Sequence, residues 1–349
     1  MASGLGTAAV SSSLDLSAKE SQEKANHGCI TDIGSLRIGH FTFSERPTGC
    51  TVVLFDQPTV AAVDVRGFAP GTRETDLLNP LNTVQQVNAI LLTGGSAFGL
   101  DAAGGVMRYL EEHGMGFRLG PAIVPIVPAA VLFDLFVGNP KIRPTAESGY
   151  RACEAAVSSR AAEGCVGAGA GATVGTLFGR ESAMKSGIGS SSVRIGGTDL
   201  VVGAIVAVNA VGDVFDHETG KILAGARTRD GRDFLHSLAQ LKRGFGANAS
   251  EGAHTTIGVV ATNAVLTKTQ AAKLAQMAHD GLARSINPVH TTMDGDTLFA
   301  AATGTAKTKA DLTTIGAMGA EAVADAIRNA VLAATSVTGY PAHRDLSRS

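Results

Sequence analysis

Short apolar runs alternate with turn residues along the first quarter of the chain. Residues 36–43, 50–55 and 60–65 are rich in β-branched and other apolar side chains, and Pro, Gly and Asp lie between them. This pattern predicts three strands joined by tight turns. A fourth, buried strand is predicted over residues 89–92, and the glycine-rich turn of residues 94–99, GGSAFG, then leads into a helix.

Further strands and helices are predicted in the middle of the chain. The predicted strands cover residues 122–127, 191–195 and 200–209, and a predicted helix covers residues 146–162. Residues 167–175, GAGAGATVG, look like a phosphate-binding loop but lack its Gly-Lys-Ser/Thr ending. We interpret this stretch as a glycine-dense strand and turn, where another backbone or a ligand approaches closely.

A β-branched run that begins at Thr255 opens a predicted strand–helix–strand unit. The run, residues 255–263, follows a polar segment of small residues, 246–253. A helix is predicted over residues 268–285, and the second strand over residues 296–303. If the two strands are parallel, the crossover returns the chain to the same edge of the sheet. Two more helices are predicted, over residues 230–241 and 310–334.

The length and composition of the chain favour one large domain. The 349 residues are enough for one large or two ordinary domains, and 44% of them are hydrophobic, so a sizeable core is possible. Predicted elements fill the sequence without a clear linker, and we therefore expect a single domain over residues 29–340. The Ser- and Ala-rich residues 1–28 and the polar residues 341–349 are interpreted as a disordered leader and a loose tail.

Charge and residue spacing argue against several classes of partner. A net charge of −2 gives no electrostatic reason to expect nucleic-acid or anionic-membrane binding. The N-terminus lacks the pattern of a signal peptide, and the most apolar window, residues 121–138, is broken by two prolines. We therefore expect a cytoplasmic protein. The four cysteines and nine histidines show no metal-ligand spacing, so neither a metal nor a cofactor is predicted.

Thr255 is the first candidate for catalysis. A polar loop that leads into a hydroxyl residue allows that hydroxyl to attack the preceding carbonyl, here that of His254. An N-to-O acyl shift and hydrolysis would free Thr255 as a new N-terminus. Its α-amine, with a usual pKa of about 8, can act as the base for its own hydroxyl. The alternative is that this segment is ordinary strand sequence.

Three polar residues are expected close to Thr255. Asp294 and Asp296, separated by one glycine, precede the second strand of the unit and would lie at the same sheet edge as Thr255. Their carboxylates could orient an ammonium or hydroxyl group, unless the segment is an ordinary turn. Asn209 ends an apolar strand, and its amide could donate to an oxyanion.

The turn formed by Gly94, Gly95 and Ser96 is a second candidate site. Amides at a helix N-terminus could bind an oxyanion or a carboxylate. A serine nucleophile at Ser96 is disfavoured because the surrounding sequence, GSAFG, is not a GxSxG motif. Close packing of helix against strand is the alternative interpretation, in which the turn could still line a pocket.

Several segments together resemble the DmpA-type family of self-processing N-terminal-nucleophile hydrolases. They are VNAVG at 208–212, HTTIGVVATN at 254–263, HTTMDGDTLFA at 290–300, LLTGGSAFGL at 91–100 and the glycine-rich residues 167–175. The resemblance covers residues 30–303. Within the family, the Thr-Thr-Ile and Asp-Gly-Asp segments are most similar to the nylon-oligomer hydrolases, whereas the β-peptidyl aminopeptidases use a serine nucleophile and a Ser-Gly-Glu segment.

The resemblance implies a role for each matching residue. Thr255 would be the nucleophile and Asn209 the oxyanion-side amide. Asp294 and Asp296 would form the acidic pair.

Two positions depart from the pattern of the nylon-oligomer hydrolases. Thr176 stands where those enzymes have a lysine, and Phe133 stands where they have a tyrosine. Both differences bear on substrate contacts and on processing. Lys185 could replace the missing charge from a nearby position.

The resemblance also implies a fold, an assembly and an activity. The fold is α/β (α+β), a four-layer αββα sandwich, cut into residues 29–254 and 255–349 and assembled as a homotetramer. The expected activity is hydrolysis of 6-aminohexanoate (nylon) oligomers or similar linear amides. The alternatives are an aminopeptidase, a D-amino-acid amidase or esterase, a β-peptidyl aminopeptidase, and an acyltransferase similar to the ornithine acetyltransferases. An unprocessed binding protein without enzymatic activity is a further alternative.

Overall fold

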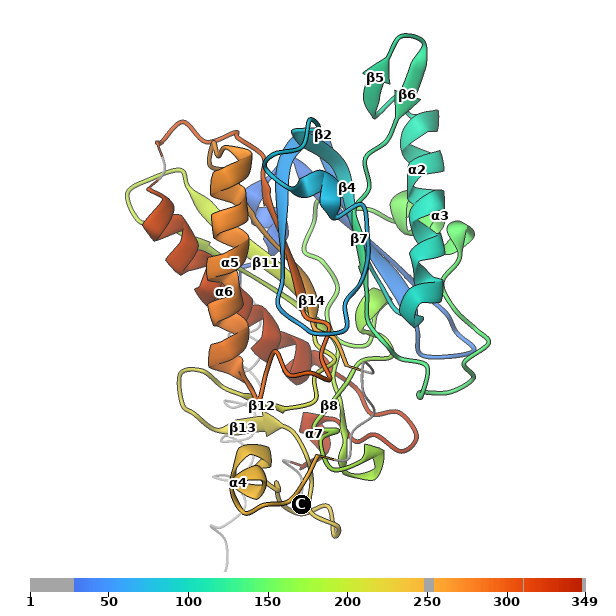
Figure 1. Cartoon of the computed structure of the whole chain (residues 1–349), viewed down its shortest axis with the longest axis vertical. Coiled ribbons are helices and arrows are strands. Elements are labelled where there is room, and N and C mark those ends of the chain that lie inside the picture. The colour runs from blue at the N-terminus through green and yellow to red at the C-terminus, as the bar shows by residue number, and fades with distance from the viewer. Residues whose placement is uncertain (1–27, 248–253, 310, 347–349) are drawn as a thin grey trace, which may run out of the picture.

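One nine-stranded β-sheet forms the centre of the molecule. It folds into two packed halves, called here the first and the second sheet, and a pair of helices covers the outer face of each (Figure 1). The computed structural model describes residues 28–247, 254–309 and 311–346. Three apolar layers lie in succession between helices and sheet, between the two sheets, and between sheet and helices. The expected four-layer αββα sandwich is therefore confirmed.

One long strand, β2 (Gly49–Val65), belongs to both sheets. Its first half pairs with β1 (Leu36–Thr42) and β4 (Gln86–Thr93), and its second half pairs with β16 (Thr297–Ala302). A register shift in the pairing with β4 separates the halves. The sequence predicts two strands and a turn at residues 56–58. The backbone instead stays extended there because both halves have partners.

The first sheet is completed by β7 (Ala129–Val131) and β3 (Gly71–Arg73). Strand β7 runs parallel to β4, and β3 lies antiparallel to β7 at the edge. Helices α2 (Ala102–Glu112) and α3 (Ala146–Glu154) cover the outer face of this sheet. Buried apolar residues of these helices and of β2 and β4 form the layer between helices and sheet.

The second sheet has the order β10-β11-β14-β16 and continues into β2. Its strands are β10 (Ile188–Arg194), β11 (Val201–Ala207), β14 (Ile257–Thr262) and β16, and its outer face is covered by α5 (Lys268–Ser285) and α6 (Leu312–Ala333). Strands β14 and β16 are parallel, with α5 between them in the chain. The predicted strand–helix–strand unit is thus confirmed.

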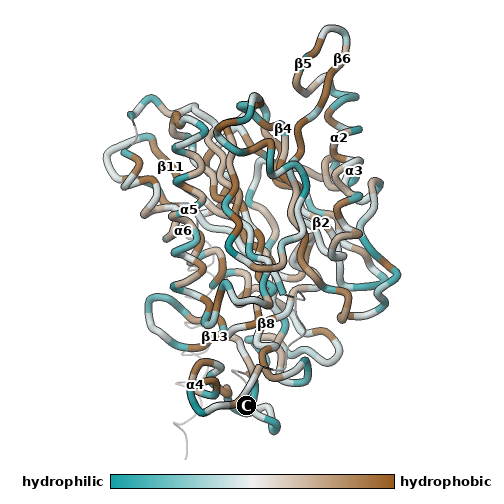
Figure 2. The backbone as a smooth tube through the Cα atoms, in the orientation of Figure 1, coloured by the Kyte–Doolittle hydropathy of each residue, from teal (hydrophilic) through white to brown (hydrophobic). Residues whose placement is uncertain are grey.

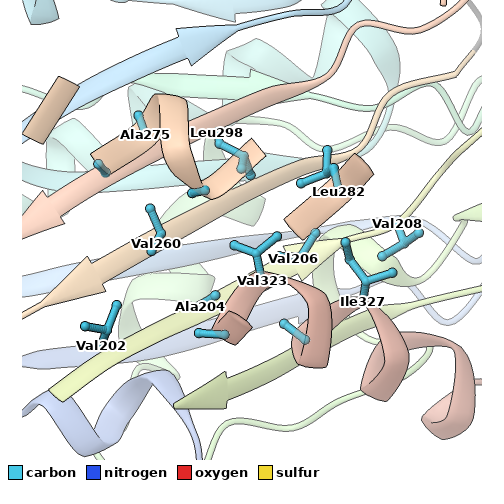
Figure 3. Close-up of a cluster of buried hydrophobic side chains, with 14 of the residues drawn as sticks. Val202, Ala204, Val206, Val208, Val260, Ala275, Leu282, Leu298, Val323 and Ile327 are labelled. Carbon is cyan, nitrogen blue, oxygen red and sulfur yellow. The ribbon is translucent and has the colours of Figure 1, made fainter. Parts of the chain in front are cut away.

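Side chains along the strands alternate between two apolar layers, as a period of two requires. In β11, Val202 and Val206 belong to the apolar layer beneath α6, to which Val323 and Ile327 of that helix also contribute (Figure 3). Ile205, which directly precedes Val206, points toward the other sheet instead. The hydropathy of the tube agrees, since hydrophobic segments run through the centre and hydrophilic ones concentrate in outer loops (Figure 2).

Shorter elements connect this frame. The remaining strands are β5 (Phe117–Leu119), β6 (Ala122–Val124), β8 (Thr173–Val174), β9 (Met184–Lys185), β12 (Asp213–Phe215), β13 (Ile222–Ala224) and β15 (Ile286–Asn287). The short helices are α4 (Ser237–Lys242), α7 (His343–Leu346) and the 3₁₀ turns η1 (Ile30–Ile33), η2 (Asp76–Leu78), η3 (Ser96–Asp101), η4 (Gly167–Gly169) and η5 (Arg180–Ser182). None of the helices in the described ranges is long and apolar enough to cross a membrane.

Long-range pairing shortens two helices that the sequence predicts. The helix expected over residues 146–162 ends at Glu154 because Val157 exchanges backbone hydrogen bonds with Ile38 of β1. The helix expected over residues 230–241 begins only at Ser237, whose amide donates to the Asp213 carboxylate at 2.7 Å.

The C-terminal segment is packed rather than loose over residues 341–346. Ala342 is fully buried, and the Pro341 carbonyl accepts a hydrogen bond from the Lys185 amide at 2.9 Å. The ring of His343 contacts the carbonyl of Leu223 at 2.6 Å. Residues 347–349 and the expected leader, apart from Gly28, lie outside the described residues.

A buried ion pair holds together the loops beside the first sheet. The Arg46 guanidinium lies 2.7 Å from the Asp134 carboxylate, and neither side chain is exposed. Arg46 also donates to the Val137 carbonyl at 2.7 Å. Asp134 accepts further hydrogen bonds from the Thr48 hydroxyl at 2.6 Å and from the Gly95 amide at 3.0 Å. Asp134 therefore connects the chain before β2 with the turn after β4.

We expect Asp134→Ala to lower the free energy of unfolding by about 3–5 kcal/mol, because it leaves the Arg46 guanidinium buried without a counter-charge. Asp56→Ala is the matched control, since Asp56 pairs with Arg37 at 3.0 Å in an exposed position and should cost about 1 kcal/mol or less. Urea denaturation of the two variants measures both values. Similar losses in both would contradict the structural role assigned to the buried pair.

Candidate active site

Thr255 lies just before β14, with its hydroxyl against the carbonyl that it would attack. Its Oγ1 donates to the His254 carbonyl oxygen at 2.5 Å, and its backbone amide donates to the Asn209 carbonyl at 2.7 Å. Only 3% of Thr255 is exposed. The nucleophile candidate, the preceding carbonyl and the leaving amide nitrogen are therefore fixed in one buried place.

The parallel pairing of β14 with β16 continues past both strands to the candidate cleavage bond. His254 and Asp294 form a parallel bridge, and the Gly295 amide donates to the His254 carbonyl oxygen at 2.8 Å. That oxygen thus accepts from two donors, the Gly295 amide and the Thr255 hydroxyl. A donor in this position would stabilise negative charge that develops on the oxygen during attack.

Gly295 packs so closely that a side chain has no room. A Cβ on Gly295 would lie 2.4 Å from the carbonyl oxygen of Ala69 and 2.8 Å from Thr255 Oγ1. The loop that contains Ala69 is itself held here, because the Ala69 amide donates to the Asp294 carbonyl at 2.9 Å. The absence of a Cβ is what allows Gly295 to bring its amide to the His254 carbonyl.

Asp296 connects the amide next to the nucleophile with a histidine. One carboxylate oxygen accepts from the Thr256 amide at 2.8 Å. The other accepts from the backbone amide of His290 at 3.2 Å and lies 2.8 Å from Nδ1 of the same residue. Asp296 is 1% exposed, so these groups take the place of water around its charge.

Asp294 occupies the other side of Gly295 and has a perturbed acidity. Its carboxylate accepts from the Thr291 hydroxyl at 2.6 Å and from the Thr291 amide at 3.0 Å. Burial, and then the nearby Asp296 carboxylate, raise the pKa of Asp294 to about 6. The two carboxylates thus differ in environment, although they flank one glycine.

His254 is buried against Thr176, the residue that departs from the lysine of the nylon-oligomer hydrolases. Thr176 Oγ1 lies 3.1 Å from His254 Nδ1. Burial lowers the pKa of His254 to about 4, although the Asp296 charge acts in the opposite direction. The ring is therefore neutral near pH 7, and a neutral hydroxyl is a suitable partner for it.

The Asn209 side chain does not reach the His254 carbonyl as an oxyanion donor would. Its Oδ1 accepts from the Thr173 amide at 3.0 Å, and its Nδ2 donates to the Phe133 carbonyl at 3.1 Å. Asn209 contacts Thr255 through its own backbone carbonyl instead. Phe133, half-buried, takes part through its backbone, and its ring lies 4.8 Å from that of Phe136.

The turn at Gly94, Gly95 and Ser96 uses its amides internally. The Gly95 amide donates to Asp134, and the Ser96 amide donates to the Leu132 carbonyl at 3.0 Å. These two amides are therefore occupied, which corrects their expected availability for an oxyanion. Ser96 adopts a left-handed backbone, with φ of 55°, and starts a 3₁₀ turn rather than an α-helix.

Lys185 lies beneath the glycine-rich segment and does not supply the charge expected beside Thr176. Its ammonium donates to the carbonyls of Gly169, Ala172 and Ser186 at 3.2, 2.9 and 2.5 Å. Burial lowers its pKa, but these three carbonyl dipoles compensate part of that cost. Lys185 therefore holds the backbone of the glycine-rich segment in place through hydrogen bonds to its carbonyl groups.

Two contributors to the site carry no individual assignment from the sequence, namely the Gly295 amide and His290. Both lie in the segment 290–300, in which only the two aspartates receive individual roles from the sequence. The clue for Gly295 was the parallel crossover, because a parallel partner must place its amides along the neighbouring strand. His290 offered no such clue, since its contact with Asp296 depends on the path of the intervening turn.

The model of peptidase family S58 matches residues 28–345, so the chain belongs to this DmpA-type family. It is an amide hydrolase of the N-terminal-nucleophile type. An L-aminopeptidase/D-Ala-esterase/amidase from Ochrobactrum anthropi, described as a variant of the N-terminal-nucleophile-hydrolase fold, has a similar structure. The TM-score is 0.66 at 20% sequence identity, covering 88% of this chain and 87% of that one, which supports the fold alone.

Two sequence relatives differ in how similar they are to the chain. An uncharacterised aminopeptidase of Mycobacterium leprae is 44% identical over 90% of this chain and 92% of its own length. A 6-aminohexanoate-oligomer endohydrolase of an Agromyces species is 29% identical over 86% of this chain and 84% of its own length. The chain is therefore more similar to this aminopeptidase than to the nylon-oligomer hydrolase, which corrects the expectation that it is most similar to the latter.

We expect Gly295→Ala to slow self-cleavage at Thr255 by about a hundredfold, because the new methyl group displaces the amide from the His254 carbonyl. Gly196→Ala is the matched control, since a Cβ at exposed Gly196 meets nothing within 4 Å. Denaturing gels of freshly purified protein follow the cleavage over time. Equal rates in both variants would remove Gly295 from the site.

The raised pKa of Asp294 makes its contribution to stability depend on pH. The folded chain holds this proton more tightly than the unfolded chain, whose pKa is near 3.8, so the contribution is full below about pH 4 and is lost as pH rises through about 6. Asparagine does not titrate, so the Asp294→Asn variant avoids this loss. We expect its free energy of unfolding, relative to that of its parent, to rise by up to about 3 kcal/mol between pH 4 and pH 7.

Urea denaturation at several pH values measures this gain, with Thr255→Ala in every protein so that the chain stays whole. Asp56→Asn, at an exposed position of β2, is the control and should run parallel to the parent. A pH-independent difference for Asp294→Asn would show that burial does not perturb this carboxyl group.

Proposed function

We propose that this chain cuts itself between His254 and Thr255 and then acts as an aminopeptidase on short peptides and related amides. One observation carries the proposal: Thr255 Oγ1 and the Gly295 amide meet at the His254 carbonyl oxygen, at 2.5 and 2.8 Å. His254, Thr255 and Asp294 are buried, so packing holds this geometry together with the parallel pairing of His254 and Asp294.

Self-cleavage proceeds through an ester. Thr255 Oγ1 attacks the His254 carbonyl carbon, and the charge that forms on the oxygen is stabilised by the Gly295 amide. The hydroxyl proton passes to the Thr255 nitrogen as the C–N bond breaks, which leaves an ester between His254 and the Thr255 oxygen. Water then hydrolyses the ester, giving a carboxylate on His254 and a free hydroxyl and α-amine on Thr255.

Turnover repeats this chemistry on a substrate amide. The neutral α-amine of Thr255 takes the proton from its own hydroxyl, which attacks the substrate carbonyl carbon. The substrate C–N bond then breaks, the amine leaves with that proton, and an ester acyl-enzyme remains. Water hydrolyses this ester, which releases the acid and restores the hydroxyl and α-amine of Thr255. The substrate carbonyl takes the place of the His254 carbonyl, so Gly295 serves as donor again. The Asn209 backbone carbonyl, which holds the Thr255 nitrogen in the uncut chain, orients the new amine.

The roles proposed for the acidic pair follow from their contacts. Asp296 binds the Thr256 amide and so fixes the backbone next to the nucleophile. Asp294, with its pKa near 6, is the group that can exchange a proton close to neutral pH. The homotetramer, which the family resemblance implies, and the cytoplasmic location expected from the sequence remain predictions.

The choice of an aminopeptidase over an oligomer hydrolase rests on similarity. The M. leprae relative, named an aminopeptidase, is 44% identical, against 29% for the endohydrolase of 6-aminohexanoate oligomers. Thr176 in place of the lysine of the nylon-oligomer hydrolases also favours a different substrate, because a neutral hydroxyl replaces a cation beside His254. Hydrolysis of 6-aminohexanoate oligomers is the second candidate.

We expect Thr255→Ala to remain a single full-length chain, whereas Thr255→Ser is still cut, because serine keeps the attacking hydroxyl. Intact mass and N-terminal sequencing identify the bond. The substrate class is tested on processed protein with an amino-acid p-nitroanilide, its N-acetyl analogue and a 6-aminohexanoate trimer.

Hydrolysis of the free-amine anilide with at least about a tenfold preference over the N-acetyl analogue is the expected result. Preferential turnover of the trimer would favour the second candidate. A Thr255→Ala chain still cut at the same bond would assign the cleavage to an external protease and overturn the proposal.

A further inference from the structure

His290 contacts Asp296 through both its backbone and its ring. Its backbone amide and its ring nitrogen Nδ1 both meet the same carboxylate oxygen of Asp296, at 3.2 and 2.8 Å. The other carboxylate oxygen holds the Thr256 amide at 2.8 Å. A continuous series of contacts therefore runs from His290 through Asp296 to the residue that follows Thr255.

The backbone of His290 is strained in a way that these contacts compensate. His290 adopts φ of 55°, a left-handed conformation that non-glycine residues seldom take. Such strain persists only where the surroundings over-determine it, and it concentrates at functional sites. Glycine would fit this backbone better, but it would remove the ring that contacts Asp296.

The neighbours of His290 settle which ring nitrogen carries the proton. Nδ1 points at a carboxylate oxygen that already accepts another hydrogen bond, so Nδ1 is the donor. Nε2 is buried and has no hydrogen-bond partner among the described residues. The neutral ring is therefore the Nδ1–H tautomer, which is held in place by the carboxylate.

A second histidine supports the ring from behind. His279 of α5 lies edge to face with His290, with 4.9 Å between ring centroids. Its own Nε2 lies 3.0 Å from the Asp64 carbonyl oxygen, which can only accept, so His279 is the Nε2–H tautomer. Its side chain is fully buried, and this fixes the plane against which the His290 ring packs.

We propose that His290 is a positioning residue for the reaction at Thr255: its Nδ1–H orients the Asp296 carboxylate, which in turn aligns the Thr256 amide and the nucleophile beside it. The role rests on the proposed function of Thr255. It does not require His290 to touch the substrate, so loss of the ring should lower kcat and leave KM nearly unchanged.

The left-handed backbone supplies a test that separates this role from a structural one. His290→Gly relieves the backbone strain and deletes the ring, so it separates the contribution of the ring from that of the backbone conformation. We expect that self-cleavage and kcat fall by about a hundredfold. His290→Asn keeps a donor near the position of Nδ1 and tolerates this backbone, so it should recover most of the loss.

His236 offers a matched control. It has the same φ of 55° but is exposed and lies at the start of α4. His236→Gly and His236→Asn should both cleave and turn over substrate like the wild type. Wild-type rates in His290→Gly, with an active wild type beside it, would overturn the positioning role. An inactive wild type would instead refute the proposed function.

The tautomer can be measured without any activity. In the uncut Thr255→Ala protein, ¹⁵N NMR of the imidazoles, assigned by single histidine variants, should show His290 as Nδ1–H and His279 as Nε2–H. An Nε2–H tautomer at His290 would contradict the proposal whatever the kinetic result.

Discussion

The parallel pairing of β14 with β16 is the constraint on which the candidate site depends. Because the parallel pairing runs on beyond both strands, the backbone alone sets His254 opposite Asp294. This register brings the Gly295 amide to the His254 carbonyl and the Thr256 amide within reach of Asp296. Side chains then refine a register that already exists. The two apolar layers on either side of these strands keep that register from slipping, since a shift by one residue would exchange the two faces of each strand.

Local pattern predicted the elements around the site well. The bounds of α5 agree with the prediction because a polar cap, Thr267, and a regular apolar period mark it. The grouping of Thr255 with Asp294 and Asp296 also followed from the sequence, since a parallel crossover has few geometries and the family resemblance pointed to the same residues. Such features depend on neighbours in the chain or on general rules of topology.

Side-chain partners were not predictable in the same way. The side chain of Asn209 is hydrogen-bonded to Phe133 and Thr173, which lie in other parts of the chain. These contacts hold its amide group away from the His254 carbonyl. The hydrogen bonds from Lys185 to backbone carbonyls and from the Gly95 amide to the Asp134 carboxylate likewise depend on how loops pack. Composition and residue spacing do not predict these contacts, because each contact joins segments that are distant in the sequence.

The strand order of the second sheet has a consequence for a cut at Thr255. Strands β14 and β16 come after the cleavage bond, but their outer neighbours, β11 and β2, come before it. The two strands of the later segment thus lie between strands of the earlier segment and are hydrogen-bonded to them along both edges. Neither part could leave without opening the sheet. Scission would double the number of polypeptides while leaving one folded body.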